Sequence, residues 1–455
     1  MAPPLFQSKD NEFIAWYPNN LTSVEAGNVW KRKDAGFYIH IPFCDAICDY
    51  CGFSVQRIRE ANIERYILAL EKEIALHSER MHFSARNFIC GHFGGGTPSA
   101  ISAEAFLRIK RAMDKAVCIA NDAEITIEVN PISFTEEKAR TYKEAGINRL
   151  SFGMQTFSDR HLATIGRPHR KSDIERTLLN IFQNKWQNFS LDLIYGIPGQ
   201  TIDELTTDLS RAIDTGAPHI TCFRLEIIPF TKLKLREAAG ELPQRLTLDL
   251  LDAMDSHVSS TLLNAGYKQY GAFNFAKPGF ESVHNRIAFE APQLEYIGLG
   301  NSAYSYMEDY VFCNKSSIEE YCSDLDSGQF PIALARKVNA REKMARYFVL
   351  GLKMQRVSRS KFEIEFGLSP QFIYGEQIDA LMYSGYLIIE NDDYVVTEKG
   401  TRYINNIAKM FYTAENIGVR QHLQFEPNIT SEQVMRYAKL ARDRKLIPLE
   451  NELSD

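Results

Sequence analysis

Apolar and polar positions follow two patterns from about residue 35 onward, in which short runs that are apolar on both faces alternate with longer amphipathic stretches. The short runs are rich in Val, Ile, Phe and Leu, and they cover residues 36–42, 87–96, 124–131, 149–157, 189–198 and 219–229. Strands that are apolar on both faces and joined by helical crossovers form a parallel sheet covered by helices. The pattern therefore predicts an α/β fold with a partial (β/α)6-type barrel.

Amphipathic stretches such as residues 62–80 and 135–146 are predicted to be the helices between these strands. Thr135 is suited to start the second helix and Gly146 to end it. In barrels of this kind the carboxyl ends of the strands carry the chemistry. The most distinctive glycine-rich and cysteine-rich segments fall at such strand ends, so we expect the functional site there.

The pattern changes after about residue 335, where amphipathic helices are followed by a predicted hairpin around residues 391–393. This predicts a small domain similar to a winged helix. Many winged helices bind DNA, but this one lacks a basic stripe, which favours a lid or an interaction module. We expect four segments: an N-terminal extension (1–35), a core barrel with its extension (36–330), the winged-helix-like lid domain (331–420) and a C-terminal tail (421–455).

Composition narrows the class of protein. The 455 residues carry a formal net charge of −6, which gives no indication of a nucleic-acid partner. No apolar run reaches the roughly 18–20 residues of a membrane span, and the first residues lack the features of a signal peptide. Eight cysteines are too few for a disulfide scaffold, so we expect a cytoplasmic protein with reduced thiols. Five scattered cysteines are expected to be small buried side chains: Cys90, Cys118, Cys222, Cys313 and Cys322.

Three further cysteines, Cys44, Cys48 and Cys51, lie within eight residues just after the first predicted strand. A zinc site is one alternative, but zinc takes four ligands and the chain offers no second close pair of cysteines. A redox Cys-x-x-Cys pair would leave Cys44 without a role. Three close thiolates without a fourth fit a 4Fe–4S cluster with one open iron, which can bind a small molecule through amino and carboxylate groups.

The spacing Cys-x3-Cys-x2-Cys after a first barrel strand resembles the radical S-adenosylmethionine (SAM) superfamily. Longer segments resemble its oxygen-independent coproporphyrinogen III oxidase-like branch, from residue 36 to about 420: YIHIPFC, HFGGGTPSA, RLSFGMQTFSDRHLATIGRPH, LDLIYGIPGQT, NFAKPGFESVHN and GLGNSAYS. The resemblance implies a 4Fe–4S cluster on Cys44, Cys48 and Cys51, with SAM at the open iron. It also implies a small-molecule substrate and an electron donor such as flavodoxin or ferredoxin.

The same resemblance implies positions for two SAM molecules. Tyr38 and Glu128 match positions that contact the first SAM. Gly95, Gly96 and Thr97 belong to a glycine-rich strand end that its methionyl group can approach, although such glycines can also serve only a tight turn. The positions similar to a second SAM site are Tyr50, Gly96, Thr97, Gln155, Arg167 and Asp192. Taken singly, each of these is more often a structural polar residue.

Two residues are candidates for catalysis and for cofactor contact. Glu226, at the end of the sixth predicted strand, could face the second SAM or the substrate as an acid or base. A salt bridge with Arg224 or a nearby lysine is the structural alternative. Tyr304 stands in a turn where the heme-chaperone relatives carry a His, and it is the second candidate.

Departures from the relatives narrow the function. Phe53 stands where decarboxylating oxidases carry a further cysteine, which argues against coproporphyrinogen decarboxylation. Heme chaperones resembling this chain have an H-N-x-x-Y-W segment that begins here at His284, but Ala288 and Phe289 replace its Tyr and Trp. These changes argue against heme binding as the function. His284 itself can be a hydrogen-bonded structural residue.

The remaining resemblance is to class C radical SAM methyltransferases and cyclopropane-forming enzymes. We therefore expect transfer of a SAM-derived methylene or methyl group to an sp2 carbon of a small aromatic or unsaturated substrate. Two cofactors held in contact make hydrogen transfer between them effectively unimolecular, and the C-terminal domain could exclude water as a lid. Two alternatives stay open, a heme chaperone and a tetrapyrrole-modifying enzyme such as one that opens the heme ring anaerobically.

Overall fold

The computed structural model of the chain describes residues 17–18, 34–80, 83 and 86–416. Most of the N-terminal extension expected at 1–35, and all of the tail expected at 421–455, lie outside the described residues. Among the helices of the described ranges, none is both long and apolar enough to cross a membrane.

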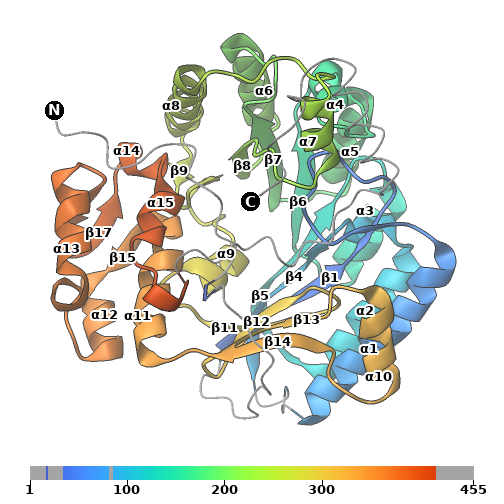
Figure 1. The fold of residues 1–455 in the computed structure, drawn as a ribbon. Helices are drawn as coiled ribbons and strands as arrows, with labels where there is room; N and C mark the ends of the chain where they lie inside the picture. The colour runs from blue at the N-terminus through green and yellow to red at the C-terminus, as the bar shows by residue number, and fades with distance from the viewer. Residues whose placement is uncertain (1–16, 19–33, 81–82, 84–85, 417–455) are drawn as a thin grey trace, which may run out of the picture.

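Six parallel strands form a partial barrel, in the spatial order β1, β4, β5, β6, β7 and β8. They span Asp34–Ile41, Asn87–Gly95, Cys118–Val129, Arg149–Gln155, Phe189–Tyr195 and His219–Arg224. The connecting helices lie on the outer face (Figure 1) and are α1 (Glu60–Arg80), α2 (Ala103–Ala116), α3 (Glu136–Glu144), α4 (Asp159–Thr164), α5 (Lys171–Gln183) and α6 (Ile202–Asp214). The α/β fold with a partial (β/α)6-type barrel is confirmed.

The predicted and observed strand boundaries differ most at β5 and β8. β5 begins at Cys118 rather than at residue 124, and β8 ends at Arg224 rather than at residue 229. The chain turns after β8, where the Leu225 N–H donates to the Tyr195 carbonyl (2.8 Å). Ile228 then packs over the cysteine loop, close enough that a Cβ added at Gly52 would lie 3.1 Å from Ile228 Cδ1. The apolar residues after Arg224 therefore cover the site instead of extending the sheet.

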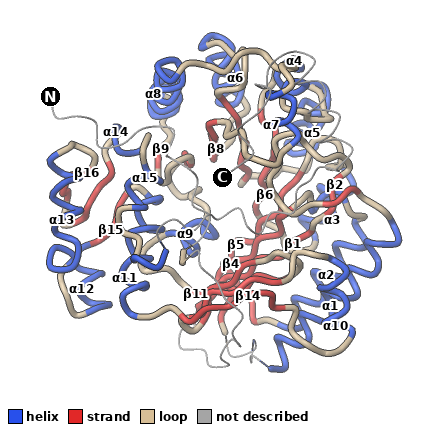
Figure 2. The backbone as a smooth tube through the Cα atoms, viewed as in Figure 1, coloured by secondary structure: helices blue, strands red, loops and turns tan. Residues whose placement is uncertain are grey.

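The sheet continues on both sides of the barrel strands, to twelve strands within the described residues. Beside β1 lie β11 (Glu295–Leu299), which is parallel to it, and then the antiparallel strands β12 (Tyr304–Met307), β13 (Tyr310–Asn314) and β14 (Ile332–Lys337). Beside β8 lie β10 (Asn274–Ala276) and β9 (Lys268–Gln269). The helices of this part are α7 (Lys232–Ala238), α8 (Leu248–Asn264), α9 (Val283–Phe289) and α10 (Ile318–Asp326). Figure 2 shows the strands in red, with α1 and α2 along their outer side.

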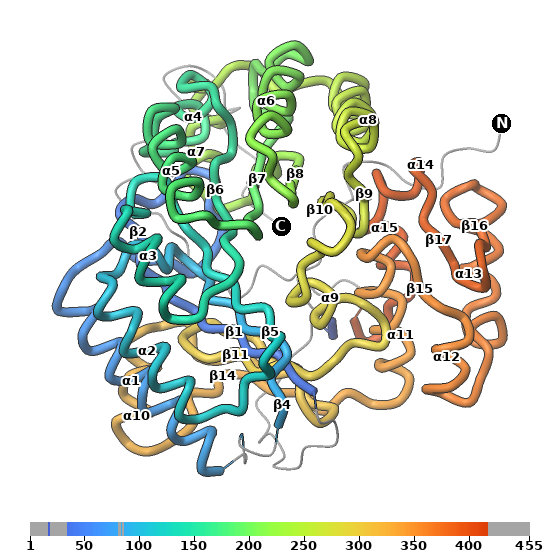
Figure 3. Tube along the Cα trace, turned by 180° about the vertical axis from the view of Figure 1, so that it is seen from behind, coloured from blue at the N-terminus to red at the C-terminus, as the bar shows by residue number. Residues whose placement is uncertain are grey.

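Residues 340–416 form a smaller domain beside α8 and α9 (Figures 1 and 3). Its helices are α11 (Ala340–Gly351), α12 (Arg359–Phe366), α13 (Pro370–Tyr383), α14 (Glu398–Thr401) and α15 (Ile404–Lys409), and its antiparallel strands are β15 (Arg356–Ser358), β16 (Leu387–Glu390) and β17 (Asp393–Val396). Asn391 and Asp392 both have positive φ angles, 50° and 69°, as a two-residue hairpin turn requires. The hairpin predicted there is present, whereas the start of the 331–420 segment forms β14 and pairs with the large sheet.

Four of the five scattered cysteines are buried as expected: Cys90, Cys222, Cys313 and Cys322. The expectation for Cys118 was wrong, because it is exposed. Cys118 is the first residue of β5, and none of the first five residues of this strand is buried.

Glu73 joins four elements around one buried carboxylate. This α1 side chain is fully buried and accepts hydrogen bonds from the Gly300 N–H (2.7 Å), Asn314 Nδ2 (2.6 Å) and the Tyr321 hydroxyl (2.6 Å). His77 Nε2 lies 3.7 Å from the same carboxylate. The donors belong to the loop after β11, to β13 and to α10, so Glu73 fixes the extension of the sheet against the barrel.

We expect Glu73→Ala to lower the free energy of unfolding by about 3–5 kcal/mol, since it leaves several buried donors without their acceptor. The measurement is urea denaturation followed by circular dichroism. Glu79→Ala, at an exposed position of the same helix, is the control and should change stability by about 0.5 kcal/mol or less. Equal urea midpoints of unfolding for the two variants would contradict the stabilising role of the Glu73 hydrogen bonds.

Candidate functional site

The cysteine loop follows β1 and is closed by a pair of short parallel strands, β2 (Phe43–Cys44) and β3 (Gln56–Arg57). Inside the loop, the Cys51 N–H donates to the Cys48 carbonyl (3.2 Å). Cys44 is buried, while Cys48 and Cys51 are partly exposed. The loop therefore presents three thiols at the carboxyl end of β1.

Asp49 anchors this loop to the opposite side of the barrel. Its carboxylate is 4% exposed and lies 2.9 Å from Lys232 Nζ and 2.5 Å from Arg236 Nη1, both in α7. The Asp49 carbonyl accepts a hydrogen bond from the Leu233 N–H (2.6 Å), and its own N–H donates to the Ile165 carbonyl (3.2 Å). A buried carboxylate is stable only with such partners, so segments that follow α4 and β8 hold the cysteine loop in place.

Thr97 and Arg167 contact two of the cysteine sulfurs. The Thr97 hydroxyl lies 3.4 Å from Cys44 Sγ, and Arg167 Nη1 lies 3.2 Å from Cys48 Sγ. Burial, together with the nearby Cys48 sulfur, raises the pKa of Cys44 to about 11 and that of Cys51 to about 12. These thiols become thiolates only beside positive charge, which iron ions provide.

Three cysteine sulfurs can hold a cluster without surrounding a single point. In the described part of the chain, no three His, Cys, Asp or Glu side chains surround a point that one metal ion could take. A 4Fe–4S cluster does not need that arrangement, because each thiolate binds a different iron atom. Cys44, Cys48 and Cys51 are the residues that would hold it.

Two carboxylates project into the barrel from β5 and β7. Glu128 Oε1 lies 2.9 Å from His92 Nε2, and the Asp192 carboxylate accepts hydrogen bonds from the hydroxyls of Ser151 (3.1 Å) and Ser190 (3.3 Å). Burial raises the pKa of Glu128 to about 7, and burial with the negative charge of Glu128 raises that of Asp192 to about 6. Within the described residues, neither carboxylate forms a salt bridge with Lys or Arg. A cationic ligand would offset this burial, and SAM carries an ammonium and a sulfonium group.

An aromatic wall stands beside Glu128. The rings of Tyr38 and His92 stack at 5.9 Å, and those of His92 and His284 at 4.5 Å. Burial lowers the pKa of His92 to about 3 and that of His284 well below its ordinary value. Sequence reasoning missed His92, although the period of two along β4 puts it on the same face as Gly94.

The glycine-rich end of β4 allows close approach between strands. Gly95 has a φ angle of +115°, and its N–H donates to Glu128. A Cβ added at Gly94 would lie 2.8 Å from Glu128 Oε1, and one at Gly96 would lie 2.8 Å from the Pro42 carbonyl carbon. The glycines therefore serve both the turn and the approach of the backbone to the site.

Gln155, Arg167 and Tyr50 gather on the other side of the cysteine loop. A Cβ added at Gly153 would lie 2.9 Å from Arg167 Nη2 and 3.0 Å from Gln155 Nε2, so both side chains meet at this glycine. Arg167 donates to the Gly153 carbonyl as well as to Cys48. Tyr50 packs with Ile165, Ile194 and Ile197. The structure thus brings together three of the residues expected at a second SAM.

The placement of Glu226 differs from the expectation. It lies two residues beyond the end of β8 and is exposed. Its charge acts on Lys353 of the small domain, whose pKa burial lowers to about 7 against the opposing effect of Glu226. Arg224 pairs instead with Asp252 and Asp255, at 3.7 and 3.3 Å. The structure thus places Glu226 beyond the strand end and under the influence of a lysine, while its role as an acid or base stays a prediction.

Tyr304 lies in the extension of the sheet beside β1. It is the first residue of β12, which is separated from β1 by β11, and its hydroxyl bonds with Cys313 on β13. Lys353 was not singled out from the sequence at all. It is 6% exposed, and its Nζ lies 5.3 Å from the centroid of the Phe289 ring. A lone lysine in a helical stretch carries no signal that could have revealed this position.

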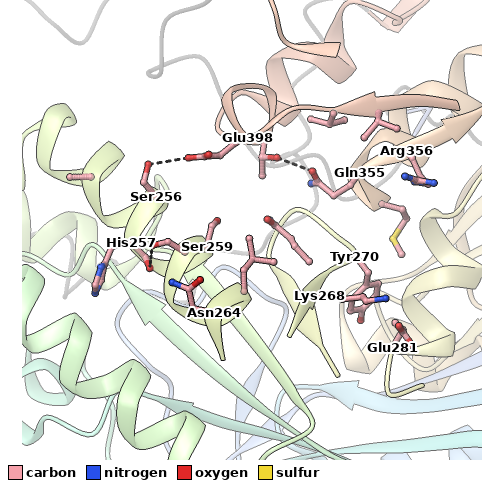
Figure 4. A pocket seen from close by; sticks show the side chains of 18 of the residues that line it. Ser256, His257, Ser259, Asn264, Lys268, Tyr270, Glu281, Gln355, Arg356 and Glu398 are labelled. Atoms are coloured by element: carbon pink, nitrogen blue, oxygen red, sulfur yellow. Dashed lines mark hydrogen bonds between the residues drawn. The ribbon is translucent and has the colours of Figure 1, made fainter. Parts of the chain in front are cut away.

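A cavity of about 990 Å³ lies between α8 and the small domain, away from the cysteines. The side chains that line it include Ser256, His257, Lys268, Tyr270, Arg356 and Glu398 (Figure 4). Ser256 Oγ donates to Glu398 Oε1 (3.3 Å), which links the two domains across this cavity. None of the site residues expected from the sequence lines it.

Comparisons with known proteins agree with this geometry. The sequence pattern of the radical SAM superfamily matches residues 38–212. The heme chaperone HemW of Bacillus subtilis (strain 168) is 30% identical over 379 residues, covering 82% of this chain and 98% of that protein. HemW of Escherichia coli (strain K12) is 29% identical over 386 residues, covering 84% of this chain and 99% of that protein. The structure of E. coli coproporphyrinogen III oxidase (HemN), a radical SAM enzyme, has a TM-score of 0.75 at 24% identity and covers 84% of this chain and 90% of that one.

The fold and the cysteine loop define a radical SAM protein. This chain belongs to the radical SAM superfamily, in the branch that contains HemW and shares the fold of HemN. The resemblance noted in the sequence is thereby confirmed, and the family implies a 4Fe–4S cluster and SAM as cofactors. None of these three proteins is named as a methyltransferase.

We expect simultaneous replacement of Cys44, Cys48 and Cys51 by Ala to reduce bound iron from about four atoms per chain to nearly none. The measurement is iron and sulfide analysis of anaerobically purified protein. Cys118→Ala is the control, since this thiol is exposed and remote in sequence from the loop, and it should keep the iron content of the wild type. Wild-type iron in the triple variant would contradict the cluster assignment.

Proposed function

We propose that this chain is a radical SAM enzyme that modifies a tetrapyrrole such as heme, and that it uses two SAM molecules. The observation that carries the proposal is the pair of half-buried carboxylates, Glu128 on β5 and Asp192 on β7, without lysine or arginine partners among the described residues. The chain is similar to heme chaperones over nearly their whole length, which favours a tetrapyrrole over an unrelated small aromatic compound.

The first SAM is proposed to lie between the cysteine loop and the end of β4. The backbone of Gly95 and Gly96 and the side chain of Thr97 would face its methionyl part, and Glu128 would accept a hydrogen bond from its ammonium group. The 4Fe–4S cluster, when bound, supplies the electron for reductive cleavage of a SAM carbon–sulfur bond. Tyr38 and His284, whose rings stack with centroids 6.1 Å apart, would shield this side of the SAM from water.

The second SAM is proposed to lie beside Asp192, Gln155 and Arg167. Asp192 would accept from an ammonium or ribose hydroxyl group, and Arg167 could bind a carboxylate through its guanidinium. This set of residues favours methylene transfer to an sp2 carbon. A meso carbon of a tetrapyrrole is such a carbon, so a tetrapyrrole substrate and the methylene chemistry are compatible.

The contact between α9 and the small domain supports a flat acidic substrate. Phe289 offers an aromatic face, and Lys353 Nζ lies 5.3 Å from its centroid, where its protonated form could bind a propionate. Ala288 and Phe289 replace the Tyr and Trp of the H-N-x-x-Y-W segment, which favours transient binding of a substrate over the tight binding of a carrier. A methyltransferase acting on a small aromatic compound is the second candidate, and the second SAM site alone would favour it.

Anaerobic incubation of cluster-loaded protein with SAM, dithionite and heme should consume heme and form 5′-deoxyadenosine and S-adenosylhomocysteine. The measurements are the Soret absorbance and liquid chromatography of the nucleosides. A carrier would bind one heme tightly and leave it unchanged, with no S-adenosylhomocysteine formed. A methyltransferase for small aromatic compounds would form neither nucleoside in response to heme. Either result would overturn the proposed function.

Asp192→Asn should weaken binding of the second SAM roughly five- to hundred-fold, the effect of about 1–3 kcal/mol when a charged partner is lost. The carboxylate form binds the cation, and the pKa of Asp192 is about 6. Second-site binding by the wild type should therefore be complete at pH 8 and fall as the pH drops through about 6. Equilibrium dialysis with labelled SAM measures both effects.

The matched control is Asp203→Asn, at an exposed position of α6, which should bind two SAM molecules like the wild type. In the Asp192 variant, some 5′-deoxyadenosine should still form while S-adenosylhomocysteine does not. With CD3-labelled SAM, the wild type should transfer deuterium to 5′-deoxyadenosine. If no deuterium is transferred with the substrate present, the methylene chemistry is wrong.

A further inference from the structure

A buried chain of hydrogen bonds leads away from Asp192 beneath the site. Ser190 Oγ lies 3.3 Å from Asp192 Oδ1 and 2.8 Å from His219 Nδ1. His219 Nε2 lies 2.7 Å from the Tyr270 hydroxyl. Ser190 and His219 are each 1% exposed, so water does not compete for these bonds.

Tyr270, at the end of this series of hydrogen bonds, determines which group donates in each of them. The Tyr270 hydroxyl accepts from the Ser282 N–H (3.1 Å), and Asn285 Nδ2 lies 3.4 Å away as a second donor. Asn285 Nδ2 also faces the Asn274 Oδ1 acceptor at 3.4 Å, which agrees with this orientation of the amide. With donors on its oxygen, the Tyr270 hydroxyl directs its one hydrogen to His219 Nε2.

His219 must then carry its proton on the other ring nitrogen. Burial lowers its pKa well below the ordinary value, so the ring is neutral and has one N–H group. Because Nε2 accepts from Tyr270, the proton is on Nδ1 and is donated to Ser190. Ser190 has a single hydrogen, which remains for Asp192 Oδ1.

We propose that Tyr270 and His219 are positioning residues that act through Ser190 to orient the Asp192 carboxylate and keep it ionised for a cationic ligand. This inference rests on the proposed function, in which Asp192 faces the second SAM. Tyr270 also holds the N-terminus of α9 through Ser282, so the same hydroxyl aligns the helix that carries His284. Tyr270 lines the cavity between α8 and the small domain (Figure 4), so the chain of hydrogen bonds ends at the cavity wall.

Other titratable and charged groups lie near this series of hydrogen bonds, and they remain when one of its hydroxyl groups is removed by substitution. Glu128 and Arg149 act on Asp192, Arg149 and Glu124 act on Tyr270, and Asp192 in turn acts on Tyr50 and Cys222. Arg149 lies 3.8 Å from Glu124, which offsets its charge. The Tyr270→Phe substitution removes none of these charged groups. An altered protonation of Asp192 in that variant therefore comes from the hydrogen bonds.

The test is Tyr270→Phe in the cluster-loaded protein, with Tyr267→Phe as the matched control. Tyr267 also has a buried hydroxyl with a short hydrogen bond, to the Ala217 carbonyl (2.6 Å), but no link to Asp192. In Tyr270→Phe the His219 proton can move to Nε2, Ser190 can turn its hydrogen toward Nδ1, and Asp192 loses a donor. Second-site SAM affinity at pH 7 should fall roughly three- to tenfold, the effect of one hydrogen bond, and its loss with falling pH should begin at a higher pH. Tyr267→Phe should match the wild type.

A second measurement does not depend on SAM. Nitrogen-15 NMR of histidine-labelled protein should show His219 protonated on Nδ1 in the wild type, with its signals identified by their loss in His219→Gln, and protonated partly or wholly on Nε2 in Tyr270→Phe. An Nε2–H form of His219 in the wild type would overturn the inference, as would an unchanged pH profile of second-site binding in Tyr270→Phe. If the wild type binds only one SAM, the proposed function fails, and the tautomer alone decides the hydrogen-bond assignment.

Discussion

The two salt bridges of Asp49 are the interaction on which the site depends. Three thiols can share one cluster only if a loop with little structure of its own is held rigidly. Asp49 provides this by pairing with Lys232 and Arg236, while its backbone is fixed by Leu233 and Ile165. These partners follow α4 and β8, on the far side of the barrel. The position of the cysteines therefore depends on closure of the whole partial barrel and not on local sequence.

The parts of the site that follow strand periodicity could be predicted from the sequence. Because parallel strands end at one edge of the sheet, residues such as Glu128 and Asp192 could be placed together from the ends of their apolar runs. The period of two also puts side chains of one face in register, which would have revealed His92 and Ser190 beside them. The barrel and the hairpin turn at Asn391 were predictable for the same reason, because both follow from local patterns of apolar, polar and turn residues.

Contacts between residues remote in sequence could not be predicted in this way. Asp49 and Arg236 are 187 positions apart, and no local pattern indicates their pairing. The apolar run after Arg224 resembles a strand, but it packs on the cysteine loop, so Glu226 lies farther out than the pattern indicates. Tyr304 was assigned by its place in a motif, and the added strand β11 separates it from β1. Both differences in placement concern packing between elements, which periodicity does not encode.

The hydrogen-bond donors around Glu128 and Asp192 are neutral, and this explains how the barrel can hold a cation. Burial keeps His92, His219 and His284 uncharged, so they give hydrogen bonds or ring contacts without neutralising Glu128 or Asp192. A lysine in the place of His92 would pair with Glu128 internally, and the negative charge would no longer be available to a ligand. Glu128 and Asp192 are instead half-buried carboxylates whose pKa values are raised, so that their ionised forms are disfavoured. A bound cation removes that penalty, so its affinity and the stability of the fold are linked.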